Sequence, residues 1–174
     1  KGEAVVSGDA HDDNVAPSIM GGFTIATDDG VSQVDADIPL VACLPDIVVS
    51  TRDARRVVPE RTSVDQLVET VGNAARLTTG MHRDDPDLVG AGMYDSVVTP
   101  ARAELIDGYA AVREAALEAG ATGVTISGAG PTVIAACHDT DQRSIGSAMI
   151  EAFAEEGVDA QVYQTRIGRG ATVF

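Results

Sequence analysis

The sequence contains very little of several residue classes. Aromatic residues make up 3% of its 174 residues, tryptophan is absent, and Lys1 is the only lysine. Two cysteines, Cys43 and Cys137, lie in apolar stretches, which predicts buried thiols rather than a disulfide framework. No segment approaches the roughly 18 consecutive apolar residues of a membrane helix. The first five residues lack the apolar region of a secretory signal, so we expect no membrane association and a cytoplasmic location.

Positive charge is also scarce. Aspartate and glutamate number 27 against 12 lysines and arginines, which gives a net charge of −15 at pH 7. This balance disfavours nucleic acid and anionic membranes as partners, because both would repel the protein. The acids are spread along the chain, and 18 of the 27 are aspartate. The pattern resembles the surfaces of proteins from salt-loving organisms and predicts a haloarchaeal source; a GC-rich genome is the alternative explanation.

Helical periodicity is clear in three places. Apolar residues in the first segment recur at the spacing of one helical face, and Ser63 with Gln66 forms a capping box. Thr99 is the expected N-cap of the second helix, with Pro100 at its first position. We predict helices over 64–81, 100–119 and 141–156.

Strand patterns separate these helices. The order is strand, helices, strand, strand, helix, strand, which is the split β-α-β order of a ferredoxin-like α+β sandwich with helices on one sheet face. Residues 1–37 read as the end of a preceding domain, with a short helix over 15–20 and a hairpin. We therefore predict a boundary between 1–37 and 38–174. The strands of the second part are predicted at 38–49, 123–127, 132–137, 158–165 and 171–174.

Two clusters in the first third could bind a ligand. Glu3 and the run 7–17, which includes His11 and Asn14, could hold a metal, a phosphate or an amino-acid head group; the alternative is a turn that caps the short helix. Residues 50–56 contain three arginines directly after an apolar strand. Guanidinium groups there suit a carboxylate or phosphate, although they could instead pair with nearby acids.

Two further clusters lie later in the chain. In residues 127–132, Gly128 and Gly130 flank Ala129 between two strands, so their amides could support a phosphate or another loop, although a hairpin needs glycines regardless. Arg102 lies in the first turn of the predicted second helix. A cation there opposes the helix dipole, which suggests an anion bound nearby.

Together these clusters resemble the homoserine kinases of the GHMP kinase superfamily. The matching motifs, which run through nearly the whole chain, are Gly2-Glu3, His11-x-x-Asn14-Val-Ala-Pro, Ser-Thr51-x-x-x-Arg55, Pro100-Ala-Arg102 and Ser127-Gly-Ala-Gly-Pro-Thr. The phosphate loop of the superfamily, of the Pro-x-x-x-Gly-Leu-Gly-Ser-Ser type, is absent. The resemblance implies that 1–37 ends an N-terminal ATP-binding domain and 38–174 is the GHMP C-terminal domain. The missing half is either truncated or separately encoded, and we expect the chain alone to be inactive.

The resemblance also implies an activity and a set of roles. The activity is ATP-dependent phosphorylation of the L-homoserine side-chain hydroxyl in threonine biosynthesis, by direct in-line attack with Mg²⁺ and without a dedicated base. ATP, homoserine and the missing N-terminal half are the implied partners, and a homodimer is a candidate assembly. The implied roles are Glu3 as the catalytic Mg²⁺ ligand, Thr51 as a catalytic hydroxyl near the substrate hydroxyl, His11, Asn14, Arg55 and Arg102 as substrate-binding residues, and Gly128, Ala129 and Gly130 as support for the phosphate loop.

Two alternatives remain open from the sequence. One is another small-molecule kinase of the superfamily, of the mevalonate or shikimate type. The other is a non-catalytic amino-acid-binding module with a ferredoxin-like fold, which fits the missing phosphate loop but leaves Glu3 and the glycine-rich turn unexplained.

Overall fold

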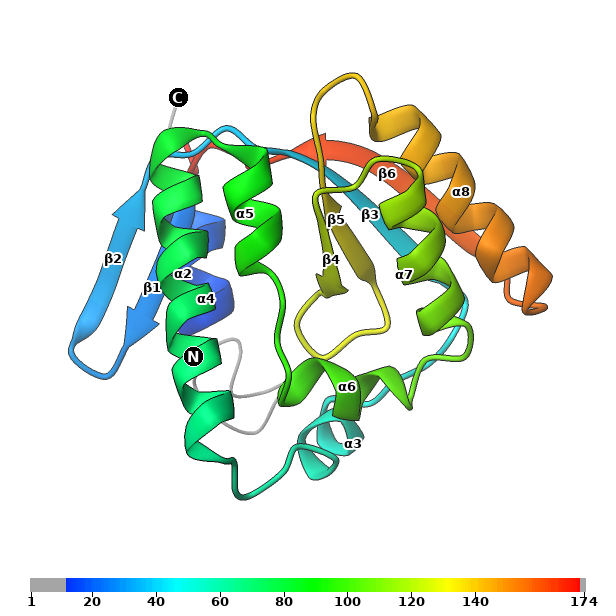
Figure 1. The fold of residues 1–174 in the computed structure, drawn as a ribbon. Helices are drawn as coiled ribbons and strands as arrows, with labels where there is room; N and C mark the ends of the chain where they lie inside the picture. Colours follow the sequence, from blue (N-terminus) through cyan, green and yellow to red (C-terminus); the bar gives the residue numbers. More distant parts are fainter. Residues whose placement is uncertain (1–11, 173–174) are drawn as a thin grey trace.

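A four-stranded antiparallel sheet forms the centre of the structure, a computed structural model that describes residues 12–172 (Figure 1). Its spatial order is β4-β5-β3-β6, so β3, the first of these four strands along the chain, lies between β5 and β6. This order is that of a ferredoxin-like fold, which confirms the predicted class. A separate antiparallel pair, β1 with β2, precedes the sheet. The strands are β1 (Phe23–Thr27), β2 (Gly30–Val34), β3 (Pro39–Pro45), β4 (Gly123–Ile126), β5 (Val133–Ala136) and β6 (Ala160–Arg166).

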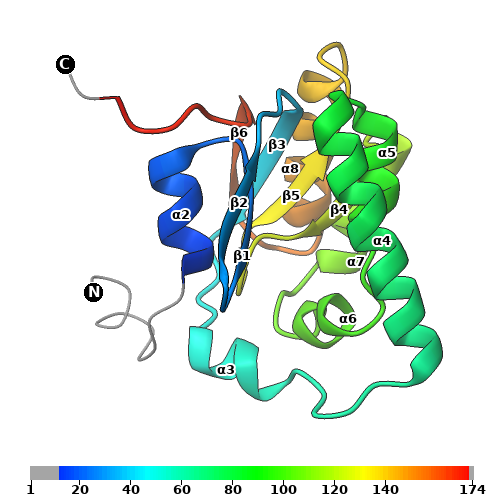
Figure 2. The same cartoon turned by 90° about the vertical axis from the view of Figure 1, so that its left-hand side faces the viewer.

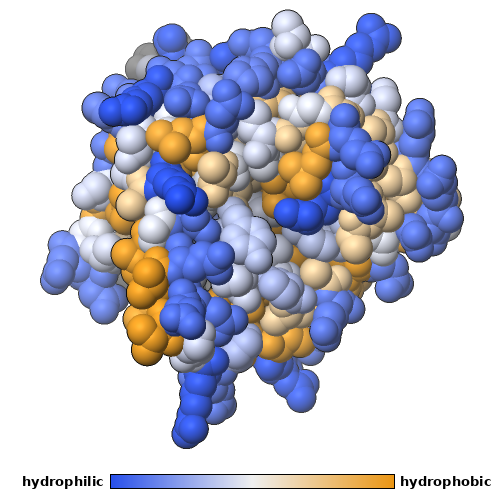
Figure 3. All heavy atoms as spheres, in the orientation of Figure 1, coloured by the Kyte–Doolittle hydropathy of each residue, from blue (hydrophilic) through white to orange (hydrophobic). Residues whose placement is uncertain are grey.

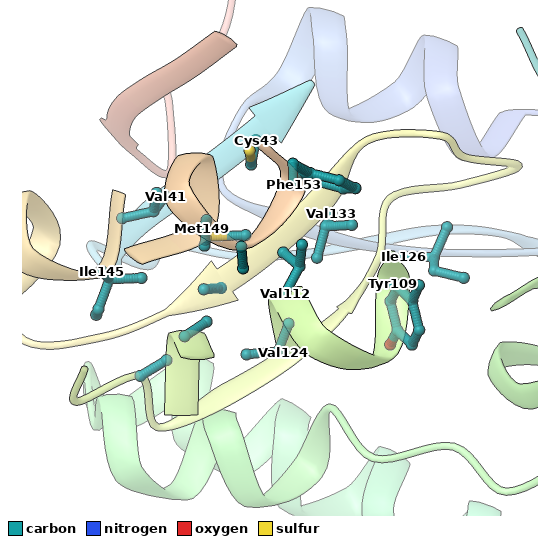
Figure 4. Packing of buried hydrophobic residues seen from close by; sticks show 14 of the residues in the cluster. Val41, Cys43, Tyr109, Val112, Val124, Ile126, Val133, Ile145, Met149 and Phe153 are labelled. Carbon is teal, nitrogen blue, oxygen red and sulfur yellow. The ribbon is translucent and has the colours of Figure 1, made fainter. Parts of the chain in front are cut away.

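Helices lie on both faces of this sheet. Alternate residues of a strand point to opposite faces, and Val41 and Cys43 of β3 are buried beneath α7 and α8 with Met149 and Phe153 (Figure 4). The strand residues in between point to the other face of the sheet, where they pack against residues of α4 and α5. The helices are α2 (Asp12–Met20), α3 (Thr51–Arg56), α4 (Val64–Arg83), α5 (Pro86–Gly92), α6 (Val98–Ala103), α7 (Tyr109–Glu118) and α8 (Gln142–Glu155).

Helices were predicted on one face of the sheet, and the structure shows that the second face is covered as well. Ala136 of β5 packs there with Ile38, Met81 and Val89, and the β1–β2 hairpin adds Phe23 and other partly buried residues. The helices inserted after β3 therefore close a second apolar core. Because the hairpin shares this core, residues 23–34 are packed against the sheet; the domain boundary at 37/38 stays a prediction.

The predicted helix over 100–119 is two helices. Gly108 lies between α6 and α7 with a φ of 82°, in the left-handed region that only glycine adopts readily. Helix α7 buries Tyr109, Val112 and Ala116 on one face. The third predicted helix is confirmed as α8, and it ends before Gly157, whose φ is also positive.

Helix α4 confirms the helix predicted over 64–81. The capping box between Ser63 and Gln66 is present. The apolar stripe that starts at Val64 is exposed, however, while Asn73, Gly80 and Met81 are buried. A 3.6-residue period shows that one face is apolar, but not whether the rest of the chain covers it.

The C-terminal segment does not form the predicted strand over 171–174. Ala171 N–H donates to the carbonyl of Ile19 at 2.8 Å, and Gly21 makes an isolated bridge with Arg169, so this segment runs beside the end of α2 (Figure 2). Residues 171 and 172 are outside any strand, and 173–174 lie outside the described part. Both cysteines are buried free thiols as predicted, and burial raises the pKa of Cys43 to about 11. None of the helices within 12–172 is long and apolar enough to cross a membrane.

Candidate functional site

Helix α3 presents two of the predicted site residues. It begins directly after β3 and its connecting loop, where Ser50 accepts a hydrogen bond from Asp53 N–H at 3.1 Å and caps the helix. Thr51 and Arg55 are exposed, whereas Ala54 between them is fully buried. Helix α3 therefore packs against the rest of the protein through Ala54, while the Thr51 hydroxyl and the Arg55 guanidinium lie at the surface.

Helix α6 presents Arg102, and it is capped by a residue that the sequence reading overlooked. The Asp95 carboxylate accepts hydrogen bonds from the amides of Val97, Val98 and Thr99 at 2.7–3.2 Å. The predicted N-cap, Thr99, lies inside the helix and its hydroxyl pairs with that of Thr125 on β4. Because the helix begins at Val98, Arg102 lies in its last turn.

This position overturns the dipole argument for a bound anion. A cation in the last turn complements the helix dipole instead of opposing it. Arg102 also has protein partners: Nε donates to the Ala54 carbonyl at 3.3 Å, and Nη1 donates to the Gly128 carbonyl at 2.6 Å. Arg102 therefore connects α3 to the glycine-rich turn.

The glycine-rich turn joins β4 to β5 and lies beside α6 at the same end of the molecule (Figures 1 and 2). It is closed by Ser127 N–H donating to the Thr132 carbonyl at 2.8 Å. Gly128 and Gly130 both have positive φ. A Cβ at Gly130 would also come within 3.3 Å of Ile106 and Ile126 side-chain carbons, so this turn needs glycine for space as well as for conformation.

The structure brings some of the predicted site residues together and leaves others apart. Thr51, Arg55 and Arg102 lie at one end with the turn that contains Ala129. Asn14 is exposed in the first turn of α2, on a separate element. Glu3 and His11 lie outside the described residues. Within 12–172, no group of three or more His, Cys, Asp or Glu side chains could hold a metal ion.

Asp95 is the residue that sequence reasoning missed, and a signal for it was present. An aspartate three residues before an apolar-periodic segment with proline in its first turn is a typical helix start. Burial raises the pKa of Asp95. The hydrogen bonds from the amides of Val97, Thr99 and Val98 and from the Thr99 hydroxyl lower it by more, so the net pKa lies below the ordinary value. Asp95 holds α6 in place and, through α6, Arg102.

We expect Asp95→Asn to lower the free energy of unfolding by about 0.5–1 kcal/mol at neutral pH, because asparagine lacks the negative charge that complements the helix N-terminus and accepts through one oxygen, where the carboxylate accepts through two. Because folding lowers the pKa of Asp95, its contribution is complete above the unfolded aspartate pKa and is lost as pH falls through the lower folded pKa. The difference between the two proteins should therefore shrink in acid. Denaturant unfolding at pH 7 and in steps below pH 4 measures it.

Asp107→Asn is the matched control, since Asp107 is exposed in the turn before Gly108. We expect it to change the free energy of unfolding by less than about 0.5 kcal/mol. Equal losses in the two variants, or a loss in Asp95→Asn that does not depend on pH, would contradict the capping role.

Comparisons with known proteins agree with this geometry. Residues 77–155, from α4 to the end of α8, match the family model described as GHMP kinases C terminal. Over all 174 residues the chain is 83% identical to a homoserine kinase of Haloarcula marismortui and 71% identical to one of Natronomonas pharaonis. Over residues 77–155 the chain is therefore similar to the C-terminal domain of the GHMP kinases. It covers 60% of each of these two relatives, so it spans about three fifths of their length.

A solved structure shows the same GHMP kinase fold. The crystal structure of homoserine kinase from Cytophaga hutchinsonii superposes with a TM-score of 0.90 at 35% sequence identity. The match covers 97% of this chain and 56% of the other. The ferredoxin-like sheet, the hairpin before it and the inserted helices are therefore arranged as in that GHMP kinase.

Proposed function

We propose that the protein containing this chain is a homoserine kinase, which transfers the γ-phosphoryl group of ATP to the side-chain hydroxyl of L-homoserine. The observation that carries this proposal is the 83% identity along the entire chain to a relative that bears this name. A cytoplasmic location and a role in threonine biosynthesis belong to the same proposal. So does adaptation to high salt, which the net charge of −15 supports.

The geometry around Arg102 supports a carboxylate-containing substrate. A guanidinium has five N–H donors, and Arg102 uses Nε and one Nη1 donor on the carbonyls of Ala54 and Gly128. Three donors remain on Nη1 and Nη2, and guanidinium donors of this kind suit the oxygens of a carboxylate. Arg55 on the adjoining helix is the second proposed carboxylate ligand.

The chemistry requires little beyond positioning and charge neutralisation. Phosphoryl transfer proceeds by in-line displacement, and catalysis depends on holding the donor and the acceptor. In this proposal Thr51 lies near the substrate hydroxyl, Asn14 and His11 contact the amino acid, and the 127–132 turn supports the phosphate loop. Mg²⁺ would neutralise phosphate charge, with Glu3 as its proposed ligand.

A substrate panel tests the proposal. The full-length protein, assayed with Mg-ATP in molar KCl, should phosphorylate L-homoserine with a kcat/KM at least about 100-fold above those for mevalonate and shikimate. Preference for either of the other two acceptors would replace the proposal with the superfamily alternative. Amino-acid binding without any phosphorylation would support the non-catalytic module.

A truncated protein is the internal control. The 174-residue chain, which contains no phosphate loop of the superfamily type, should show no phosphorylation above background. Activity in this chain alone would contradict the assignment of the phosphate-binding half to the part of the relatives that it does not cover.

A further inference from the structure

A buried asparagine lies on the inward side of α4. Asn73 is 6% exposed, although Figure 3 shows hydrophobic atoms at the surface along the course of the same helix. Burying a side-chain amide costs free energy unless its donor and acceptor groups are hydrogen-bonded. An asparagine at such a position therefore indicates directed contacts, which an aliphatic side chain of similar size could not make.

Both ends of the Asn73 amide have a partner. Its Nδ2 donates to the Tyr94 carbonyl at 3.0 Å, and its Oδ1 accepts from Arg76 Nη1 at 3.3 Å. Because a guanidinium can only donate, Arg76 fixes the amide with its oxygen toward the arginine and its nitrogen toward the carbonyl. Tyr94 belongs to the connection between α5 and α6, so Asn73 attaches this connection to α4.

The α5–α6 connection is held to α4 at two further points. Gln66 Nε2 donates to the Ser96 carbonyl at 3.3 Å. At the end of α5, a Cβ on Gly92 would lie 2.4 Å from the backbone nitrogen of Leu77, so the absence of a side chain lets the two helices touch there. The connection is therefore fixed at its start, at its centre through Asn73 and near its end.

These contacts continue to the candidate site. Asp95, which lies between the two carbonyls that α4 holds, accepts hydrogen bonds from the first amides of α6. Arg102 lies in the last turn of that helix and donates to the Ala54 and Gly128 carbonyls. Because α6 has only six residues, a shift at its start also moves Arg102. A misplacement of about 1 Å that originates far from the chemistry can lower a rate by about 100-fold.

We propose that Asn73 is a positioning residue for substrate binding: it holds the α5–α6 connection, and thereby Asp95 and α6, where the Arg102 guanidinium can bind the substrate carboxylate. This role rests on the proposed function, from which the carboxylate substrate is taken. None of the predicted site residues lies on α4, so Asn73 acts on the substrate through Arg102. The contacts that define the role join described residues to one another and do not involve the outward side of α4.

Steady-state kinetics of the full-length protein tests this role. Asn73→Leu keeps the approximate size of the side chain and removes both hydrogen bonds. We expect it to lower kcat/KM for homoserine at least about 10-fold, with KM for ATP within about twofold of wild type. Asn73→Asp keeps an acceptor for Arg76 but places an oxygen against the Tyr94 carbonyl, so it should not restore the loss.

Ile145→Val is the matched control. Ile145 on α8 is fully buried in the other core, so the substitution lowers the unfolding temperature without changing the α5–α6 connection. It should leave kcat/KM for homoserine within about twofold. If Asn73→Leu lowered kcat/KM no more than Ile145→Val does, Asn73 would have a structural role alone and the positioning role would be overturned.

A double-variant cycle tests the route through Arg102. In the Arg102→Leu protein, adding Asn73→Leu should lower kcat/KM for homoserine by less than about twofold, because the group through which Asn73 acts is already absent. Equal factors for Asn73→Leu in the wild-type and Arg102→Leu backgrounds would show that Asn73 acts independently of Arg102, and the role would be rejected.

Hydrogen exchange of the full-length protein gives a readout that needs no substrate. The amides of Val97, Val98 and Thr99, which donate to Asp95, should exchange at least about 10-fold faster in Asn73→Leu and at the wild-type rate in Ile145→Val. Unchanged exchange in Asn73→Leu would overturn the role. A wild-type protein that phosphorylates another acceptor, or none, would refute the proposed function instead, and the exchange rates would still decide whether Asn73 holds α6.

Discussion

Replacing Arg102 with leucine should lower kcat/KM for homoserine by a factor corresponding to about 2–4 kcal/mol in the full-length enzyme that we propose. The substitution removes the donors that we propose for the substrate carboxylate, and it also removes the contacts to the Ala54 and Gly128 carbonyls. Arg102→Lys should restore little, since one ammonium cannot donate to two carbonyls and a carboxylate in one plane. Steady-state kinetics with homoserine and ATP varied separately measures the effect, and KM for ATP should be nearly unchanged.

Arg55→Leu and Arg143→Leu complete this experiment. Arg55→Leu should give a loss of the same order, because Arg55 is the second proposed carboxylate ligand. Arg143 is exposed in the first turn of α8, on a helix that contributes no site residue, and its replacement should leave kcat/KM within about twofold. If Arg102→Leu behaved like Arg143→Leu, or changed only KM for ATP, the carboxylate site would have to be abandoned.

Replacing Gly90 with alanine should lower the free energy of unfolding by about 3 kcal/mol, even though alanine is the better helix former. A Cβ at Gly90 would lie 2.2 Å from the backbone carbonyl carbon and oxygen of Thr122. A Cβ at Gly123 would in turn lie 2.4 Å from the Gly90 carbonyl oxygen, so the two backbones are in close contact. The backbone of β4 cannot move aside as the end of a flexible side chain can. Helix α5 would therefore have to move away from β4, which would disrupt the packing of Val89 in the core.

Denaturant and thermal unfolding in molar KCl measure this loss, and Gly168→Ala is the control. A Cβ at Gly168 meets nothing within 4 Å and its φ is not in the left-handed region. We expect that variant to stay within about 0.5 kcal/mol of wild type. A Gly90→Ala protein as stable as the control would show that α5 is not packed against β4 as described.

Much of the fold could be predicted because its signals are local. The capping box at Ser63 and the helix predicted over 141–156 depend on residues close in sequence, and both were found in place. The order of these elements was enough for the ferredoxin-like class, since few sheet topologies fit it. Errors arose where a local signal competed with a stronger neighbour: Asp95 starts α6 before Pro100, and Gly108 divides the long helix.

The candidate site was predictable as a set of motifs but not as an arrangement. Thr51, Arg55 and Arg102 could be singled out from residue type and resemblance, yet nothing in their spacing reveals that Arg102 donates to two carbonyls far away in the chain. That contact depends on how α3, α6 and the β4–β5 turn pack against the sheet. Glu3 and His11, outside the described residues, stay predictions.

The sequence by itself determined the class of fold, the acidic character, the two buried thiols and the positions of the motifs. Only the tertiary structure decided which faces those elements expose. The apolar stripe of α4 has the same periodicity whether it packs against a core or faces water. Periodicity shows that a helix has an apolar face, but it does not show what lies against that face. In the described residues that stripe faces outward, while Asn73 and Met81 face inward. The reason is physical: α4 approaches the second core through Gly80, where Val89 lies too close for any side chain.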